Sequence, residues 1–294
     1  KYTMPEIETV ADVGNTLGEG VIWNPRDQAI YWADSKGTPR IQRCDSKTGK
    51  IDEWAMPDLL GSFVFREQGG AVAGLKSGFH FVDLETGAVE LIHDPEPDLA
   101  ENRLNDGKCD RRGRYWCGSL DDGGPGGGSL YRLDPDLTCH KMDSGVTVSN
   151  GIAWSPDNKT MFYSDSRSRI CYNFDFDIET GAVSNKRVFT STEDIPGRID
   201  GATVDADGYY WCAHIGDWQI AKYDPAGNIV DTVRLPVKYP TMCSFGGPNL
   251  DVLYVTSALQ FVQPDEAADQ PLAGALLAIH GTGAQGIAEP FFAG

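Results

Sequence analysis

The chain has 294 residues and a formal net charge of −18. Such an acidic chain offers no basic face for nucleic-acid phosphates or for anionic membrane lipid, so we expect neither partner. No stretch reaches the roughly 18 apolar residues of a membrane-spanning helix, and the first residues show no signal-peptide pattern. We therefore expect a cytoplasmic protein, either a monomer or a weak homo-oligomer.

One pattern recurs six times in chain order: a turn, then a short strand rich in aromatic and β-branched residues. The copies occupy residues 29–34, 70–74, 113–118, 160–165, 208–213 and 251–256. They follow one another at intervals of about 40 to 48 residues, which is typical of propeller blades. The 34 glycines and 17 prolines supply many turns. The sequence thus predicts an all-β fold, a six-bladed β-propeller, with an open β-sandwich as the alternative.

The two ends of the chain offer strands that could close the ring. Residues 6–10 alternate polar and apolar side chains, and we expect this strand to complete the last blade together with residues 275–279 and 290–292. No linker interrupts the array, so residues 1–294 are predicted to form a single domain. The chain has seven cysteines, and their odd number and wide spacing indicate reduced structural thiols.

Three segments share a polar residue, a glycine and then an apolar strand: residues 17–23, 148–154 and 198–204. Innermost strands of a propeller converge at one end of its axis, so Glu19, Asn150 and Asp200 are candidates for one metal site. Their oxygens suit Ca²⁺, Mg²⁺ or Mn²⁺, and are compatible with Zn²⁺ and Fe²⁺. Three protein ligands leave positions open for substrate, as in catalytic sites. Taken singly, each residue also fits an ordinary turn.

A fourth segment, residues 101–110, precedes the third copy of the repeat. Arg103 and Asn105 have the same side-chain parity, so both are expected to point into the channel and to bind hydroxyl or carboxylate groups. Asp106 is expected to point away and to cap a turn. An ordinary surface loop is the alternative for this segment.

The motifs LGEGVIW (17–23), NRLNDGKCDRRGRYWCGSL (102–120), VSNGIAWSPDNKTMFYSDS (148–166) and DGATVDADGYYWCAHIG (200–216) resemble the SMP-30/gluconolactonase/regucalcin family. The resemblance extends over nearly the whole chain. It implies a six-bladed propeller with a divalent metal held by Glu19, Asn150 and Asp200. It also implies substrate contacts from Arg103 and Asn105, and hydrolysis of sugar lactones, typically aldonolactones.

Some positions depart from familiar members, in regions where the substrate would be selected. Residues 259–262 read LQFV where the family often has arginine and glycine. An acidic residue near the glycine-rich loop 123–128 contacts sugar hydroxyls in some relatives, and we favour Asp121 over Asp122 for this role. His214 lies either at the mouth of the same site or at a strand end with its hydrogen bonds satisfied.

The resulting hypothesis is metal-dependent hydrolysis of a sugar lactone to the aldonic acid, with Asp200 orienting or deprotonating the attacking water. The chain has no GxSxG motif and no cysteine with an evident histidine partner, so direct attack by water is expected. Two alternatives are a calcium-binding regulatory protein without significant turnover and a lactonase for a modified, for example sulfonated, sugar lactone. Another metal hydrolase on this fold also stays open. A WD-type scaffold is disfavoured because its repeat signature is absent.

Overall fold

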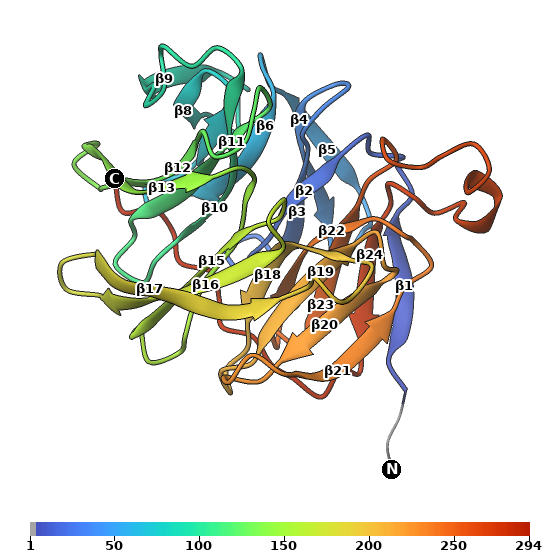
Figure 1. Cartoon of the computed structure of the whole chain (residues 1–294). Coiled ribbons are helices and arrows are strands. Elements are labelled where there is room, and N and C mark those ends of the chain that lie inside the picture. The colour runs from blue at the N-terminus through green and yellow to red at the C-terminus, as the bar shows by residue number, and fades with distance from the viewer. Residues whose placement is uncertain (1–3) are drawn as a thin grey trace.

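The computed structural model describes residues 4–294, which form six four-stranded antiparallel sheets arranged as blades around one axis (Figure 1). In the first five blades, the strands follow chain order from the axis outward. Blade 1 comprises β2 (Gly18–Asn24), β3 (Ala29–Asp34), β4 (Arg40–Asp45) and β5 (Ile51–Ala55). Blade 2 comprises β6 (Leu60–Phe65), β7 (Ala71–Leu75), β8 (Gly78–Val82) and β9 (Val89–His93). Blade 3 comprises β10 (Asn102–Cys109), β11 (Tyr115–Asp121), β12 (Gly128–Leu133) and β13 (Cys139–Val146).

The ring continues in the same way and closes with both ends of the chain. Blade 4 comprises β14 (Ser149–Trp154), β15 (Thr160–Asp165), β16 (Ile170–Asp177) and β17 (Ala182–Ser191). Blade 5 comprises β18 (Arg198–Val204), β19 (Tyr210–Ile215), β20 (Gln219–Tyr223) and β21 (Ile229–Arg234). Blade 6 comprises β22 (Pro240–Gly246), β23 (Val252–Ser257), β24 (Leu276–His280) and, as its outer strand, β1 (Glu6–Ala11). The antiparallel pairing of β1 with β24 confirms that the N-terminal strand completes the last blade.

The six predicted copies of the repeat are the second strands of the six blades, β3, β7, β11, β15, β19 and β23. Their large aromatic side chains are fully buried between neighbouring blades, with Trp32, Trp116 and Trp211 among them. The indole N–H groups of Trp116 and Trp211 donate to Asp110 and Asp205 at 2.8 and 2.9 Å. Burial with a satisfied polar atom explains the aromatic residues in five of these six strands, whereas β7 has none. The six four-stranded sheets confirm the six-bladed propeller.

Every innermost strand breaks register against its neighbour close to the same end of the axis. Such a bulge inserts an extra residue and re-aims the adjacent side chains. At Gly20 and Gly151 the backbone adopts positive φ angles of 60° and 63°, which glycine tolerates. A Cβ atom at Gly151 would also collide with the hydroxyl of Tyr210. The polar-glycine pairs therefore mark bulges that turn Glu19 and Asn150 toward the axis.

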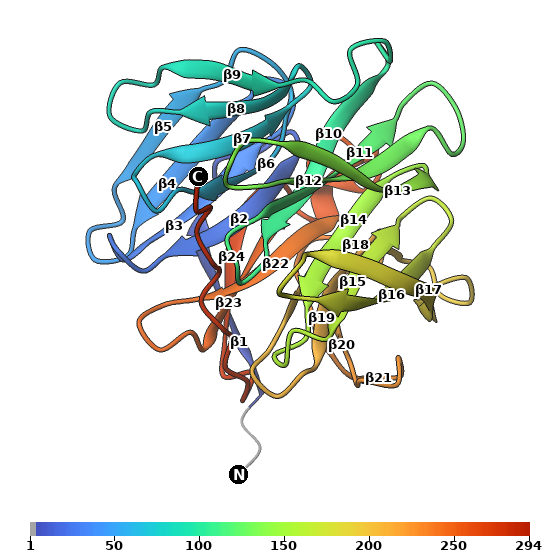
Figure 2. The ribbon, with the colours of Figure 1, turned by 90° about the vertical axis from the view of Figure 1, so that its left-hand side faces the viewer.

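The C-terminal segment, residues 284–294, crosses the opposite end of the axis (Figure 2). Our expectation that residues 290–292 join the last blade is wrong, because the Phe292 amide donates to the carbonyl oxygen of Phe65 in blade 2 at 2.7 Å. The Phe292 ring is buried against side chains of blades 2 and 3, which outweighs pairing with blade 6.

Two further features of the described residues bear on the sequence predictions. All seven cysteines are free thiols, and all except Cys139 are buried, in agreement with the predicted structural role. The only helix in residues 4–294 is a 3₁₀ turn, η1 (Ala267–Asp269), in the loop between β23 and β24. No helix in this part of the chain is long and apolar enough to cross a membrane.

Candidate functional site

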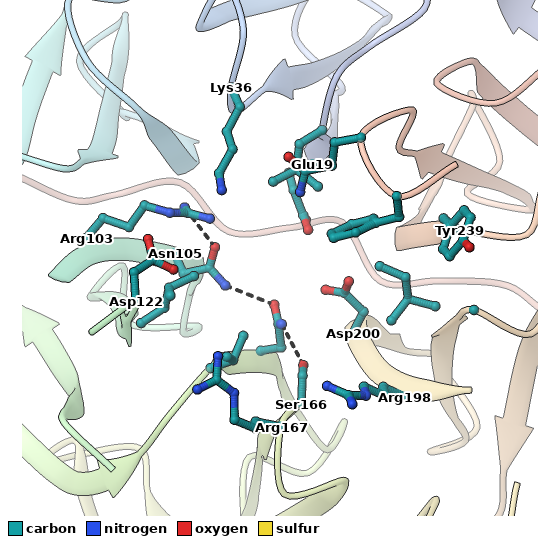
Figure 3. Close-up of a pocket in the computed structure, with 18 of the residues that line it drawn as sticks. Glu19, Lys36, Arg103, Asn105, Asp122, Ser166, Arg167, Arg198, Asp200 and Tyr239 are labelled. Carbon is teal, nitrogen blue, oxygen red and sulfur yellow. Dashed lines mark hydrogen bonds between the residues drawn. The ribbon is translucent and has the colours of Figure 1, made fainter. Parts of the chain in front are cut away.

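A cavity of about 440 Å³ opens at the end of the axis where the innermost strands begin (Figure 3). Five of the predicted site residues line it together: Glu19, Arg103, Asn105, Asn150 and Asp200. They come from β2, β10, β14 and β18, so four blades contribute. The rest of the wall consists of Leu17, Lys36, Leu120, Asp122, Val148, Ser166, Arg167, Pro196, Arg198, Ile215, Gly216, Tyr239, Gln260 and Phe261.

The two carboxylates of the predicted metal site are buried with oxygen atoms that lack partners. Glu19 and Asp200 are 5% and 6% exposed. Within residues 4–294, Glu19 Oε2 and Asp200 Oδ1 accept no hydrogen bond. Burial raises the pKa of both side chains well above the ordinary values, and the charge of Asp200 raises the pKa of Glu19 further. Two buried carboxylates of this kind call for a cation between them.

The amide of Asn150 is oriented by a chain of hydrogen bonds (Figure 3). Ser166 Oγ donates its proton to the carbonyl oxygen of Ile199, so it must accept from Asn150 Nδ2, which lies 2.7 Å away. Asn150 Oδ1 is therefore the atom that faces the cavity, where it also accepts from Asn105 Nδ2 at 3.3 Å. The third predicted ligand thus presents its carbonyl oxygen, the atom through which an amide side chain ligates a hard cation.

This donor set fits a hard divalent cation. No three Asp, Glu, His or Cys side chains within residues 4–294 gather into one potential metal site. The candidate set therefore depends on the amide oxygen of Asn150 as its third member. Two carboxylates and one amide oxygen, without sulfur or imidazole, favour Ca²⁺, Mg²⁺ or Mn²⁺.

Arg103 and Asn105 form the polar wall beside this donor set. Arg103 is 4% exposed, and its Nη1 donates to Asn105 Oδ1 at 3.1 Å, whereas its Nε has no partner within residues 4–294. Asn105 Nδ2 donates to the carbonyl oxygen of Ser149 at 2.8 Å. Burial lowers the pKa of Arg103, while the charges of Asp122 and Glu19 oppose that change. Both side chains line the cavity, which is the position that their shared parity predicts.

The structure does not bring Asp121 to the cavity. Its carboxylate accepts hydrogen bonds from the backbone N–H groups of Gly123, Gly124 and Gly127 at 2.8, 3.0 and 3.1 Å, so it folds the glycine-rich loop. Asp122 lines the cavity instead. The preference for Asp121 over Asp122 is therefore wrong. The sequence contains a pattern that indicates the role of Asp121, since an aspartate followed two residues later by glycine is typical of an Asx turn.

His214 also lies away from the cavity. It is fully buried, with Nε2 2.7 Å from the hydroxyl of Tyr223 and Nδ1 3.1 Å from Gln219 Nε2. Burial lowers the pKa of His214 to about 4. The structure supports the reading of a strand-end histidine with its hydrogen bonds satisfied.

Asp106 differs from the expectation in another way. It does not line the cavity, yet it is buried near the axis, where its Oδ2 accepts from the Ile152 amide at 3.3 Å. Burial raises its pKa to about 6, and its charge raises the pKa of Glu19 and Asp200. The register shift between Leu104 and Gly107 explains the difference, because strict alternation of side chains does not hold through a bulge.

Several lining residues were not anticipated from the sequence. Ser166, Arg167 and Arg198 lie at strand ends, and Lys36 and Tyr239 lie in loops between strands. No local sequence pattern predicts that these residues line the cavity, because the loops that meet at a propeller axis are distant in sequence. The segment 259–262 was expected to border the substrate, and its Gln260 and Phe261 do line the cavity.

Comparison with known proteins gives consistent matches over nearly the whole chain. The family model described as SMP-30/Gluconolactonase/LRE-like region matches residues 17–259. The 6-deoxy-6-sulfogluconolactonase of Pseudomonas putida is 35% identical over 95% of this chain and 96% of its own length. The L-arabinolactonase of Azospirillum brasilense is 36% identical over 97% and 95%. The crystal structure of regucalcin from Agrobacterium tumefaciens, described as a calcium-binding protein, superposes with a TM-score of 0.92 at 25% identity, covering 99% of this chain and 97% of that one.

Proposed function

Because the chain belongs to the SMP-30/gluconolactonase/LRE-like family, we propose that it is a metal-dependent lactonase that hydrolyses a small sugar lactone to the aldonic acid. The observation that carries this proposal is the convergence of unpartnered oxygens of Glu19 and Asp200 with the Asn150 amide oxygen in one cavity. Relatives named as lactonases support it. The same proposal includes a single domain over residues 1–294, a cytoplasmic location, and a monomer or weak homo-oligomer.

Glu19, Asn150 and Asp200 would hold one divalent ion. Calcium is the first choice, since a relative of this fold is described as calcium-binding, and Mg²⁺, Mn²⁺, Zn²⁺ and Fe²⁺ are the others. A bound ion would polarise the lactone carbonyl and stabilise the negative charge that develops on its oxygen.

The side chains around the donor set would bind and orient the sugar. Arg103 offers N–H groups that its own fold leaves free, and Asn105 holds it at 3.1 Å. Both groups suit the hydroxyls of an aldonolactone, and holding the ring reduces the orientational cost of the reaction. Asp200 would orient the attacking water and accept its proton, because its carboxylate lies in the cavity with an oxygen atom that has no partner in the described chain.

A metal-by-substrate screen tests this proposal. Protein treated with chelator is reloaded with each of the five divalent ions and assayed with a panel of pentono- and hexonolactones by proton release above the uncatalysed rate. We expect turnover only after reloading, and no effect of serine-directed acylating reagents. An Arg103→Ala protein should lose turnover but keep its metal, since arginine does not ligate a cation.

A second candidate, a calcium-binding protein without significant turnover, rests on the same donor set and on the relative described as calcium-binding. Stoichiometric calcium binding without hydrolysis of any lactone in the panel would favour it over the lactonase. The cavity of about 440 Å³ next to the donor set argues for a substrate, because a purely metal-binding site needs no such space.

A further inference from the structure

The cavity carries four cationic side chains although the chain as a whole has a net charge of −18. Two of them have negative neighbours: the charge of Asp122 acts on both Lys36 and Arg103. The other two, Arg167 and Arg198, form no ion pair and no side-chain hydrogen bond with any residue in the part of the chain that the structure describes. In so acidic a protein, two unpaired guanidinium groups in one cavity require an explanation.

The backbone at both arginines is held firmly. Asp165 Oδ1 accepts the amide of Arg167 at 3.1 Å, which fixes the start of this loop. Before Arg198, the side chain of Arg169 donates to the carbonyl oxygens of Ile195 and Gly197 at 3.1 and 2.9 Å. Arg169 thus fixes the segment that carries Arg198. A charged side chain on a fixed backbone is a better binding group than one on a mobile surface loop.

The two arginines also lie next to the candidate metal ligands (Figure 3). Arg167 directly follows Ser166, which orients Asn150, and Arg198 precedes Asp200 by two residues on β18. The bond from Ser166 Oγ to the Ile199 carbonyl joins these two segments, so the two guanidinium groups flank one side of the cavity, opposite Lys36.

We propose that Arg167 and Arg198 form a subsite for an anionic substituent of the substrate, at the end of the sugar remote from the reacting carbonyl. The inference rests on the proposed lactonase function and names its substrate class: lactones that carry a terminal sulfonate, phosphate or carboxylate. Guanidinium groups bind such oxyanions through paired N–H donors. Binding of neutral hydroxyl groups by the same guanidinium groups would contribute much less binding free energy.

The newly formed carboxylate of the product does not account for this pair. That group arises where the carbonyl binds, beside Glu19 and Asp200, whereas the guanidinium groups flank the cavity wall at its mouth, on exposed residues. A second negative group on the substrate is the ligand that the two charges fit. The same arrangement would favour anionic over neutral lactones through charge rather than through shape.

The test compares lactones with and without a negative charge at C6 on metal-loaded protein. Steady-state kcat/KM is measured for gluconolactone and for hexonolactones with a sulfonate, a phosphate or a carboxylate at C6. The proteins are wild type, Arg167→Gln, Arg198→Gln, the charge-retaining Arg198→Lys, and Arg187→Gln as control. Arg187 lies half-exposed on the outer strand β17 and forms an ion pair with Asp175 of β16. Its substitution therefore removes one charge far from the cavity.

We expect wild type to prefer at least one anionic lactone by about tenfold or more, since a charge-assisted hydrogen bond contributes on that scale. Arg167→Gln and Arg198→Gln should each remove most of that preference, by raising KM for the anionic lactone more than KM for gluconolactone. Arg198→Lys should retain part of it, Arg187→Gln should retain all of it, and added salt should reduce it. The arm that shows the preference identifies the anion.

A binding measurement separates this inference from the proposed function. The open-chain acids with and without the C6 anion are titrated calorimetrically, which requires no turnover. Preferential binding of the C6 anion that both glutamine variants abolish supports the subsite even if no lactone is hydrolysed. Equal affinity for charged and neutral acids, or equal kcat/KM for all lactones in an active enzyme, would overturn it while leaving the lactonase intact.

Discussion

The two ends of the propeller axis both bury charged side chains, but they treat them differently. At the end closed by the C-terminal segment, Lys108 Nζ lies 3.5 Å from Glu289 and donates to the carbonyl oxygen of Ala202 at 2.8 Å. At the open end, Glu19, Asp200 and Arg103 each retain a buried polar atom without a partner in the described chain. The same strand, β10, supplies Arg103 to one end and Lys108 to the other.

This contrast separates stability from function. A buried charge is tolerated when a partner compensates its lost hydration, and the closed end follows that rule. The open end leaves its charges uncompensated, which lowers the stability of the metal-free chain and reserves these atoms for a ligand. Substitutions at the two ends should therefore produce opposite patterns of stability and activity.

The largest effect is expected for Asp200→Ala at the open end. Removing a metal ligand and the proposed base should reduce kcat/KM by about a thousandfold or more, as loss of several kcal/mol of transition-state stabilisation implies. The metal-free variant should melt at the same temperature as wild type or higher, because a buried unpaired carboxylate is gone. Metal stoichiometry, lactone turnover and thermal unfolding test this. Retained metal and full activity would place the site elsewhere.

At the closed end, Lys108→Met should reverse the pattern. The substitution leaves Glu289 and the Ala202 carbonyl without their partner, and breaking a buried ion pair costs about 3–5 kcal/mol of unfolding free energy. Activity per folded molecule should stay near that of wild type. The double variant Lys108→Met/Glu289→Leu should recover much of the loss in denaturant unfolding. A fall in activity comparable to that of Asp200→Ala would show that the two ends are not independent.

A smaller effect at the open end is expected for Ser166→Ala. Ser166 does not face a metal ion itself but orients Asn150, and loss of such a supporting hydrogen bond costs about 10- to 100-fold in metal affinity. Ser244→Ala is the matched control, because Ser244 is equally buried on the innermost strand β22 and its hydroxyl has no partner among residues 4–294. Metal titration of both variants should separate them; equal affinities would remove Ser166 from the site.

The sequence predicts the fold and the polar centre of the site for a common reason. Aromatic residues recur in five of the six second strands because the blades bury similar surfaces. The pairs Glu19-Gly20 and Asn150-Gly151 recur because a bulge at the axis requires glycine. Local patterns therefore reveal both. That residues 1–294 form one domain, and that the site residues act as proposed, stay predictions.

The rest could not be predicted because it depends on contacts between distant loops. Arg167 and Arg198 are thirty-one positions apart, and the segments that carry them are joined by side-chain hydrogen bonds from Ser166 and Arg169. The position of Asp106 near the axis could not be predicted from the alternation of side chains, because its strand bulges between Leu104 and Gly107. The course of residues 290–292 depends on where Phe292 finds an apolar cavity, which no periodicity announces.

The smallest effect is expected for His214, a titratable side chain that is buried in the core and not in the cavity. Burial lowers its pKa to about 4 in the folded protein, against 6.5 for the unbound side chain. Between these two values the unfolded chain takes up a proton that the folded chain does not, so stability falls as the pH drops from 6.5 to 4 and is unaffected above that range. At pH 5 the loss from this group is about 2 kcal/mol.

A His214→Gln protein should lose this part of the acid sensitivity while retaining lactone turnover at neutral pH. Denaturant unfolding of both proteins at pH 7.5 and pH 5 measures the difference. An unchanged acid sensitivity, or a loss of turnover on the scale of Asp200→Ala, would mean that His214 belongs with the open end of the axis after all.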